Sequence, residues 1–184
     1  MNVAPHIFWI TSRAAGTIAM LLASAAVFAG LLVSARRKTT SNRADLRAIH
    51  EALSLSTLAM VAIHGTALLG DAFMHPGIVG ITVPFAGSYR PLWTGTGIVA
   101  GYGLAFLGLS YYARDRIGAA RWRRLHRVTA IFWLMALVHS IGAGSDAAEP
   151  WFLALNLALV APAALLLALR WLGRAGEASA ATSA

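Results

Sequence analysis

The sequence predicts an all-α integral membrane protein, a helical bundle of about five transmembrane helices. Of the 184 residues, 58% are hydrophobic and only 12% are charged, which is about half the charged fraction of an ordinary soluble domain. The apolar residues form runs of about 20, the length that a helix needs to cross the hydrocarbon core. Charged residues lie between these runs. The length suits one domain and leaves no room for a soluble nucleotide-binding domain beside the bundle.

Five apolar runs are each expected to form one membrane-spanning helix. They cover residues 7–34, 46–70, 92–112, 125–141 and 151–172. We expect a single domain over residues 1–174. The remaining residues, 175–184, are small and polar and are expected to form a disordered tail.

The basic residues predict how the chain is oriented in the membrane. Thirteen of the 15 lysines and arginines fall on one side of the predicted spans: Arg36, Arg37, Lys38, Arg43, Arg47, Arg114, Arg116, Arg121, Arg123, Arg124, Arg127, Arg170 and Arg174. Because positive loops stay in the cytoplasm, we expect the N-terminus outside and the C-terminus in the cytoplasm of a multi-pass plasma-membrane protein. The net charge of +8 is therefore interpreted as an orientation signal and not as a nucleic-acid-binding surface.

Cysteine is absent from the chain. This excludes disulfides, thiolate-bound iron–sulfur clusters and covalent attachment of haem through C-x-x-C-H. Any redox cofactor must therefore be bound non-covalently, and histidine is the candidate ligand.

Four of the six histidines lie inside predicted membrane helices: His50, His64, His126 and His139. Ionisable side chains within a span are costly, so they are functional candidates by default. A neutral imidazole is the least costly of them and is a good ligand for haem iron.

The spacing of these histidines places them at two depths. His50 and His64 are 14 residues apart on one predicted helix, and His126 and His139 are 13 apart on another, so each pair spans roughly 20 Å. The two helices run in the same direction because one helix separates them. His50 and His126 are then expected near the cytoplasmic face, and His64 and His139 near the outer face. Two pairs at matching depths predict two six-coordinate haems.

On an ideal helix, His126 and His139 would not point toward the same neighbouring helix. A spacing of 14 leaves His50 and His64 about 40° apart around the helix, whereas a spacing of 13 leaves His126 and His139 about 140° apart. The second helix therefore needs a bend, a π-bulge or a rotated approach. A single outer haem on His64 and His139 is the alternative.

Other interpretations of the histidines stay open. They could be packing or hydrogen-bonded residues, or a proton relay, for which the acidic candidate near a span is Glu51. A zinc site is disfavoured because each depth supplies only two protein ligands.

These residues resemble a known family. Trp122-Arg123-Arg124-Leu125-His126 through His139, together with His50 and His64, resembles the ferric reductase-like transmembrane domain. That superfamily includes ferric reductases, NADPH oxidases and the haem subunit of the periplasmic methionine sulfoxide reductase system. The likeness covers about residues 9–146.

The resemblance implies two non-covalent b-type haems, an inner one on His50 and His126 and an outer one on His64 and His139. It also implies that Arg13 lies close to haem propionates, which suits a guanidinium in a low dielectric. Many relatives have six helices, and this sequence predicts five. The oxidases and ferric reductases add a flavin and nicotinamide domain, for which this chain has no candidate segment.

The expected function is therefore an oxidoreductase component: a transmembrane cytochrome b that relays electrons from a cytoplasmic flavoprotein or membrane quinol to an outer small-molecule or protein acceptor. A membrane subunit serving a separate periplasmic reductase is the alternative, and a non-redox transporter is less favoured. Arg47, Arg123 and Arg127 are expected to be orientation charges, with inner propionates or an acidic donor as other partners.

The outer segment from Asp71 to Pro91 is expected to be a loop, with a re-entrant turn around Ile78–Phe85. His75, Arg90 and Asp146 are expected near the outer haem. Plain loop roles are favoured for them and for His6, and binding of a ferric chelate, oxygen or a partner protein is the alternative.

Overall fold

The computed structural model describes residues 6–35 and 41–182, and every regular element in these ranges is a helix. The elements are α1 (Ile7–Ala35), α2 (Ser41–Ala67), η2 (Leu68–Gly70), α3 (Gly77–Thr82), α4 (Pro91–Leu109), η3 (Ser110–Ala113), α5 (Arg114–Ile117), α6 (Ala119–His126), α7 (Thr129–Ala143) and α8 (Pro150–Thr182). The all-α prediction is confirmed for this part of the chain.

Four stretches of helix are long and apolar enough to cross a membrane. They are Ile7–Ser34, Ala44–Gly70, Pro91–Ile117 and Ala119–Ala143. A fifth is obtained if α8 is counted as one span, because it bends by 40° between Ala158 and Val160. The expected number of spans is thus confirmed as four to five, and the orientation of the bundle in the membrane stays a prediction.

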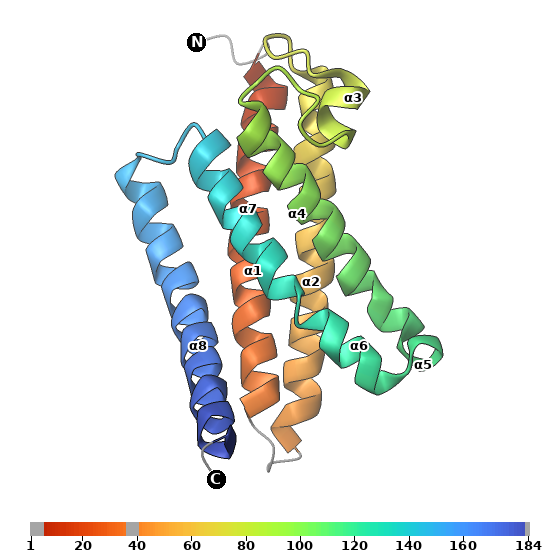
Figure 1. Cartoon of the computed structure of the whole chain (residues 1–184). Helices are drawn as coiled ribbons and strands as arrows, with labels where there is room; N and C mark the ends of the chain where they lie inside the picture. The colour runs from red at the N-terminus through yellow and green to blue at the C-terminus, as the bar shows by residue number, and fades with distance from the viewer. Residues whose placement is uncertain (1–5, 36–40, 183–184) are drawn as a thin grey trace.

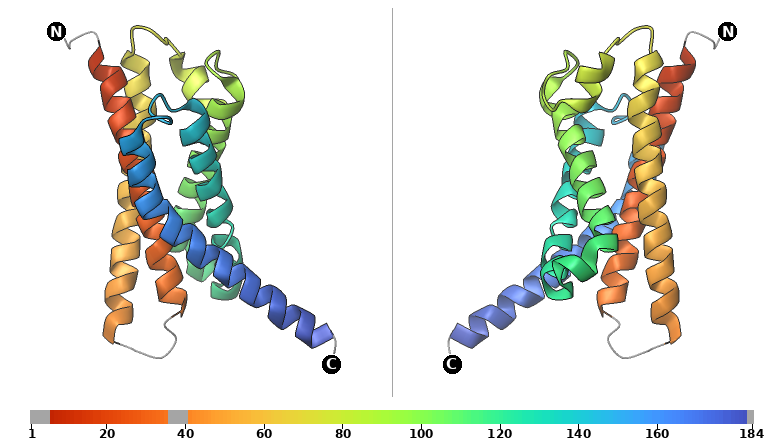
Figure 2. Two further views of the ribbon diagram at one scale, coloured as in Figure 1. Left: turned by 90° about the vertical axis from the view of Figure 1, so that its left-hand side faces the viewer. Right: turned by 90° about the vertical axis from the view of Figure 1, so that its right-hand side faces the viewer.

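The bend in α8 has a local cause. Pro162 lies inside this helix and has no N–H to donate to the carbonyl four residues earlier, that of Ala158. Beyond the bend, α8 runs obliquely away from α1 and α2 (Figure 2).

The C-terminal segment differs from the expectation of a disordered tail. Helix α8 continues to Thr182, since residues 175–182 are rich in alanine, which has the highest helix propensity. The last two residues, and the basic residues Arg36, Arg37 and Lys38, lie outside the described part of the chain.

Helix α1 lies at the centre of the bundle, beside α2, α7 and α8 (Figure 1). Its buried residues are small, alanines and serines above all, which lets neighbouring helices approach closely. The core is formed where α1, α7 and α8 meet, around the fully buried Trp133. The indole N–H of Trp133 donates to Ser24 Oγ (3.1 Å), and the Ser24 hydroxyl donates to the carbonyl of Met20 (2.8 Å).

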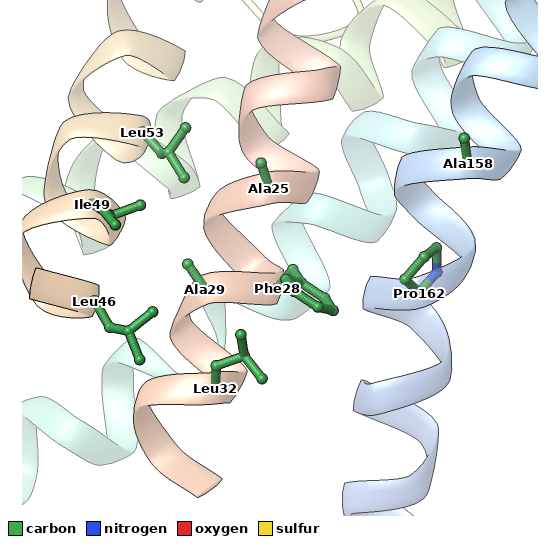
Figure 3. Close-up of a pocket in the computed structure, with 9 residues that line it drawn as sticks. All are labelled: Ala25, Phe28, Ala29, Leu32, Leu46, Ile49, Leu53, Ala158 and Pro162. Carbon is green, nitrogen blue, oxygen red and sulfur yellow. The ribbon is translucent and has the colours of Figure 1, made fainter. Parts of the chain in front are cut away.

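A wholly apolar groove of about 400 Å³ lies between α1, α2 and α8 (Figure 3). Phe28 and Leu32 of α1, Ile49 of α2 and Pro162 of α8 are among the side chains that line it. Because none of its lining residues is polar, this groove has no chemistry of its own, and the candidate site lies elsewhere in the bundle.

Candidate cofactor-binding site

The structure brings the four membrane histidines together as two pairs. The ring centroids of His50 and His126 are 6.0 Å apart, and those of His64 and His139 are 6.1 Å apart. In each pair one ring comes from α2 and the other from the α6–α7 span. These are the partners that the two depths predicted from the sequence.

A break between α6 and α7 allows His126 and His139 to face the same neighbour. Val128 N–H donates to the carbonyl of Leu125 (2.9 Å), and Ile131 N–H donates to that of Val128 (2.9 Å). Bonds to the third preceding residue indicate a tighter turn of about 120° per residue, against 100° in an α-helix. Each tightened residue removes about 20° of the expected 140° mismatch. Three such bonds, including that from Ala130 N–H to the carbonyl of Arg127 (3.4 Å), would remove about 60° of this mismatch, so overwinding at the break accounts for part of the facing of His126 and His139.

Backbone carbonyls of neighbouring helices hold three of the four rings. The Nδ1–H of His50 donates to the carbonyl of Ala26 (2.8 Å), that of His64 to Ser12 (2.8 Å), and that of His139 to Trp93 (2.9 Å). The carbonyls belong to α1 for the two rings of α2, and to α4 for the ring of α7.

A glycine lies four residues after each of these carbonyls. A Cβ atom at Gly16 would approach His64 Nδ1 to 2.9 Å, and one at Gly30 would approach His50 Cε1 to 3.1 Å. A Cβ at Gly97 would approach Cγ of His139 to 2.6 Å. In a helix, the side chain at position i+4 lies over the carbonyl of residue i, which is why serine and threonine there can bond to it. Glycine at that position uncovers the carbonyl, so an imidazole from the next helix can reach it.

Ser12 adds further contacts to the His64 ring. Its hydroxyl donates to the His64 carbonyl (3.0 Å), and the same oxygen lies 3.0 Å from His64 Nδ1. Ser12 is itself buried, with 2% of its surface exposed. The orientation of the His64 ring is therefore set by two atoms of Ser12, its carbonyl oxygen and its hydroxyl oxygen.

These hydrogen bonds decide which ring nitrogen can act as a ligand. A carbonyl oxygen can only accept, so Nδ1 of His50, His64 and His139 carries the proton, and Nε2 keeps its lone pair. Metal-bound histidines almost always donate their other N–H in this way. The three rings are thus in the tautomer that presents Nε2 as a ligand.

His126 is held differently. Its ring stacks on Trp122, with centroids 4.8 Å apart and planes 23° apart. Its buried Nδ1 has no hydrogen-bond partner among the described residues. The equivalent carbonyl of α4, that of Leu107, lies 14 residues beyond Trp93 and accepts the hydroxyl of Ser110 (2.7 Å). Residue 111, four positions further on, is tyrosine where the other three positions have glycine.

A cavity of about 860 Å³ surrounds the His50–His126 pair. Its inner wall includes Gly30, Leu58 and Trp133. Charged side chains that line it are one carboxylate and six arginines: Glu51, Arg47, Arg114, Arg123, Arg124, Arg127 and Arg170. The cavity therefore suits a large, mostly apolar ligand that carries negative charge at one edge.

Glu51, the candidate acidic member of a proton relay, is bonded to a phenol. Tyr112 Oη donates to Glu51 Oε1 (2.7 Å), and Tyr112 is exposed. No group of three or more histidine, cysteine or acidic side chains with metal-binding geometry occurs in residues 6–35 and 41–182. Each histidine pair can thus contribute two protein ligands to a metal.

Arg13 binds a carboxylate of the protein. Its guanidinium makes a two-pronged ion pair with Asp146, in which Nε donates to Oδ2 (3.1 Å) and Nη2 donates to Oδ1. The same group lies over the Trp9 ring, 4.1 Å from its centroid. A haem propionate at this position would have to share Arg13 with Asp146.

The other outer candidates do not join the histidine pairs. His6 and His75 are exposed, and His75 has a positive φ of 40°. Arg90 donates to the carbonyl of Gly142 (2.7 Å) and so links the end of the outer loop to α7. Asp146, for which no role was predicted, is the partner of Arg13 described above.

Apart from Arg13, the sequence analysis missed the contribution of α1 to the site. Gly16 and Gly30 are 14 residues apart, the same spacing as His50 and His64. That shared spacing was the available signal, because two helices packed side by side present equivalent positions at equal intervals. Gly97 was not distinguished from the other glycines of its helix, of which Gly95 and Gly103 pack against Phe85 and Phe132.

Comparison with known proteins gives no further guide: the chain matches no protein-family model, no curated protein and no solved structure.

Proposed function

We propose that the chain is a transmembrane b-type cytochrome that binds two haems, one between His50 and His126 and one between His64 and His139. In this proposal it relays electrons from a cytoplasmic flavoprotein or membrane quinol to an acceptor on the outer side. Haem iron, when bound, supplies the reversible one-electron chemistry.

The observation that carries the proposal is the geometry of the imidazole pairs. With a metal–nitrogen distance of about 2 Å, two imidazoles on opposite sides of one metal ion have ring centroids roughly 6 Å apart. The two pairs have separations of 6.0 and 6.1 Å. Three of the four rings also donate Nδ1–H to a carbonyl, which leaves Nε2 as the available ligand.

The number of protein ligands also suits haem. If haem is bound, two imidazoles at each depth would supply the two protein ligands that a six-coordinate haem iron needs. The same two imidazoles would leave zinc two ligands short of its usual four. Since the chain has no cysteine, the haems would be held by these nitrogens and by packing.

The cavity around the inner pair fits the shape and charge of the cofactor. Haem is an apolar disc with two carboxylates at one edge, and the cavity is apolar at Trp133 and lined by arginines such as Arg47 and Arg127. Arginine binds carboxylates through paired N–H groups. We propose that these arginines hold the inner propionates, in addition to orienting the chain.

The two pairs together would form a path across most of the bilayer. His50 and His64 are separated by 14 residues of α2, which is about 21 Å along a helix. At both positions a ring of α2 faces a ring of the α6–α7 span. Both cofactors would therefore lie in the space between these two helices.

Purification of the protein from cells supplied with a haem precursor tests the proposal. We expect the absorption spectrum of low-spin bis-histidine haem, with sharp bands after reduction by dithionite. Protein that is folded and monodisperse but colourless, and that does not take up added haemin, would reject it.

A further inference from the structure

The outer segment, which we define as residues 72–89, has a composition unlike that of an aqueous loop. No lysine, arginine, aspartate or glutamate occurs between Asp71 and Arg90. The segment includes α3 and many apolar residues, and several of these are exposed. Ile78 has 69% of its surface exposed, Val79 60% and Phe85 53%. In an aqueous loop, exposed apolar groups of this number would be costly.

The segment lies against α4, which is one of the membrane spans. The phenol of Tyr102 donates to the carbonyl of Thr82 (2.6 Å), the last residue of α3. Phe85 lies against Gly95, where a Cβ atom would come within 2.6 Å of the Phe85 backbone nitrogen. Helix α3 also packs against η2, at the end of α2 (Figure 1).

These contacts place the segment below the outer end of the span. Tyr102 lies 11 residues beyond Pro91, the first residue of α4, which is about 16 Å along the helix. A tyrosine in a helix points back toward the N-terminus, so Thr82 lies shallower than the Cα atom of Tyr102. It nevertheless lies alongside the candidate membrane span Pro91–Ile117 and not beyond its first residue.

The face of α4 that receives the segment is itself exposed and apolar. Tyr102 has 53% of its surface exposed, and Phe106, one turn further along, has 74%. On a membrane span, such a face contacts lipid. The segment packed beside it is therefore adjacent to lipid and not to the histidine pairs, which lie on the Gly97 side of α4.

Protein groups bond part of the polar backbone of the segment. The buried carboxylate of Asp71 accepts the N–H groups of Phe73 (2.7 Å) and Met74 (2.8 Å). In the middle of the segment, Tyr102 supplies the donor for the carbonyl of Thr82. Non-helical backbone at membrane depth is tolerated only when protein groups replace water in this way.

We propose that the outer segment is a re-entrant element that lies in the outer leaflet against α4, with Ile78 and Val79 in contact with lipid acyl chains. The occupant of this surface is lipid. A water-exposed loop and a docking surface for a partner protein are the two outcomes that would contradict the proposal.

The absence of cysteine from the natural chain permits a direct test. Single-cysteine variants Ile78→Cys and Val79→Cys are compared with Ala148→Cys, an exposed position in the loop between α7 and α8. Each purified protein is placed in phosphatidylcholine nanodiscs, where both faces are accessible, and is reacted with a charged maleimide.

We expect Ala148→Cys to react about tenfold faster or more than the other two, because an apolar environment suppresses the reactive thiolate. The three rates should become equal in denaturing detergent. Equal rates in nanodiscs would show a water-exposed loop and overturn the proposal. Rates that are equal in nanodiscs but lower for Val79→Cys in native membranes would indicate a partner protein and would also overturn it. Since the assay does not involve haem, its result is independent of the proposed function.

Discussion

Gly30 of α1 lies directly against the imidazole of His50 in α2, so that a Cβ atom at Gly30 would come within 3.1 Å of the ring. The relationship is repeated 14 residues away along the same two helices by Gly16 and His64, and between α4 and α7 by Gly97 and His139. In each case the ring reaches a carbonyl four residues before the glycine. Helix α1 thus holds the histidines of α2 in position, and helix α4 holds His139 of α7.

The first prediction concerns Gly97→Ala. The new Cβ would overlap the His139 ring and separate Nδ1 from the Trp93 carbonyl, so we expect about half of the bound haem to be lost. Haem per chain, measured by absorbance against protein concentration, checks this. The matched control is Gly65→Ala, next to His64, where a Cβ would meet nothing within 4 Å.

Alanine in place of a helical glycine ordinarily stabilises by about 0.5–1 kcal/mol, so a loss of haem in Gly97→Ala cannot come from helix propensity. Retention of both haems in Gly97→Ala would contradict the role that we assign to this glycine.

The second prediction concerns replacement of a ligand by a free molecule. We expect His139→Gly to lose the low-spin signal of one haem, because one axial nitrogen is missing. Added imidazole should restore that signal by entering the space that the side chain leaves. His75→Gly, which alters an exposed histidine away from both pairs, should leave the spectrum unchanged. If His139→Gly has the spectrum of the unsubstituted protein, His139 is not a ligand.

The third prediction follows from the angle between the rings. The planes of His50 and His126 differ by 89°, and those of His64 and His139 by 72°. When axial imidazoles are perpendicular, each donates to a different iron d orbital, and the two orbitals stay close in energy. We therefore expect ferric EPR signals of the highly anisotropic low-spin type from both haems. Rhombic signals typical of parallel imidazoles would contradict this ring geometry.

The fourth prediction separates two partners of Arg13. If its partner is Asp146, as in the structure, Arg13→Gln and Asp146→Asn should each lower the free energy of unfolding by about 1–3 kcal/mol, and the double variant should be little worse than either. A double-mutant cycle in detergent measures this coupling. If Arg13→Gln alone lowers the haem content or the midpoint potential, propionate binding, as the family resemblance implies, is favoured.

The sequence was sufficient for much of the fold, because the features that decide it are local. Apolar runs and intervening charges predicted the spans, and the boundaries of α1 and α4 differ from the prediction by only a few residues. The helical continuation to Thr182 was missed because small residues were interpreted as disorder and not as alanine-rich helix.

The sequence predicted the features of the site that depend on the spacing of residues along one helix. It did not predict the features that depend on how two helices pack against each other. The depths of His50 and His64 follow from helix rise alone. The direction in which the His126 ring points depends on the break in the helix at Arg127–Val128. That stretch contains no proline or glycine from which the break could have been predicted. Ser12 and Ala26 contribute backbone carbonyls, and a carbonyl carries no signature in the residue type.

The measurement that tests the account most directly is the ratio of haem to protein in the purified, unsubstituted chain. We predict about two non-covalent haems per chain, all low-spin. A ratio of one would leave a single histidine pair as the site. A ratio of zero in folded protein that has been offered haemin would contradict the central claim.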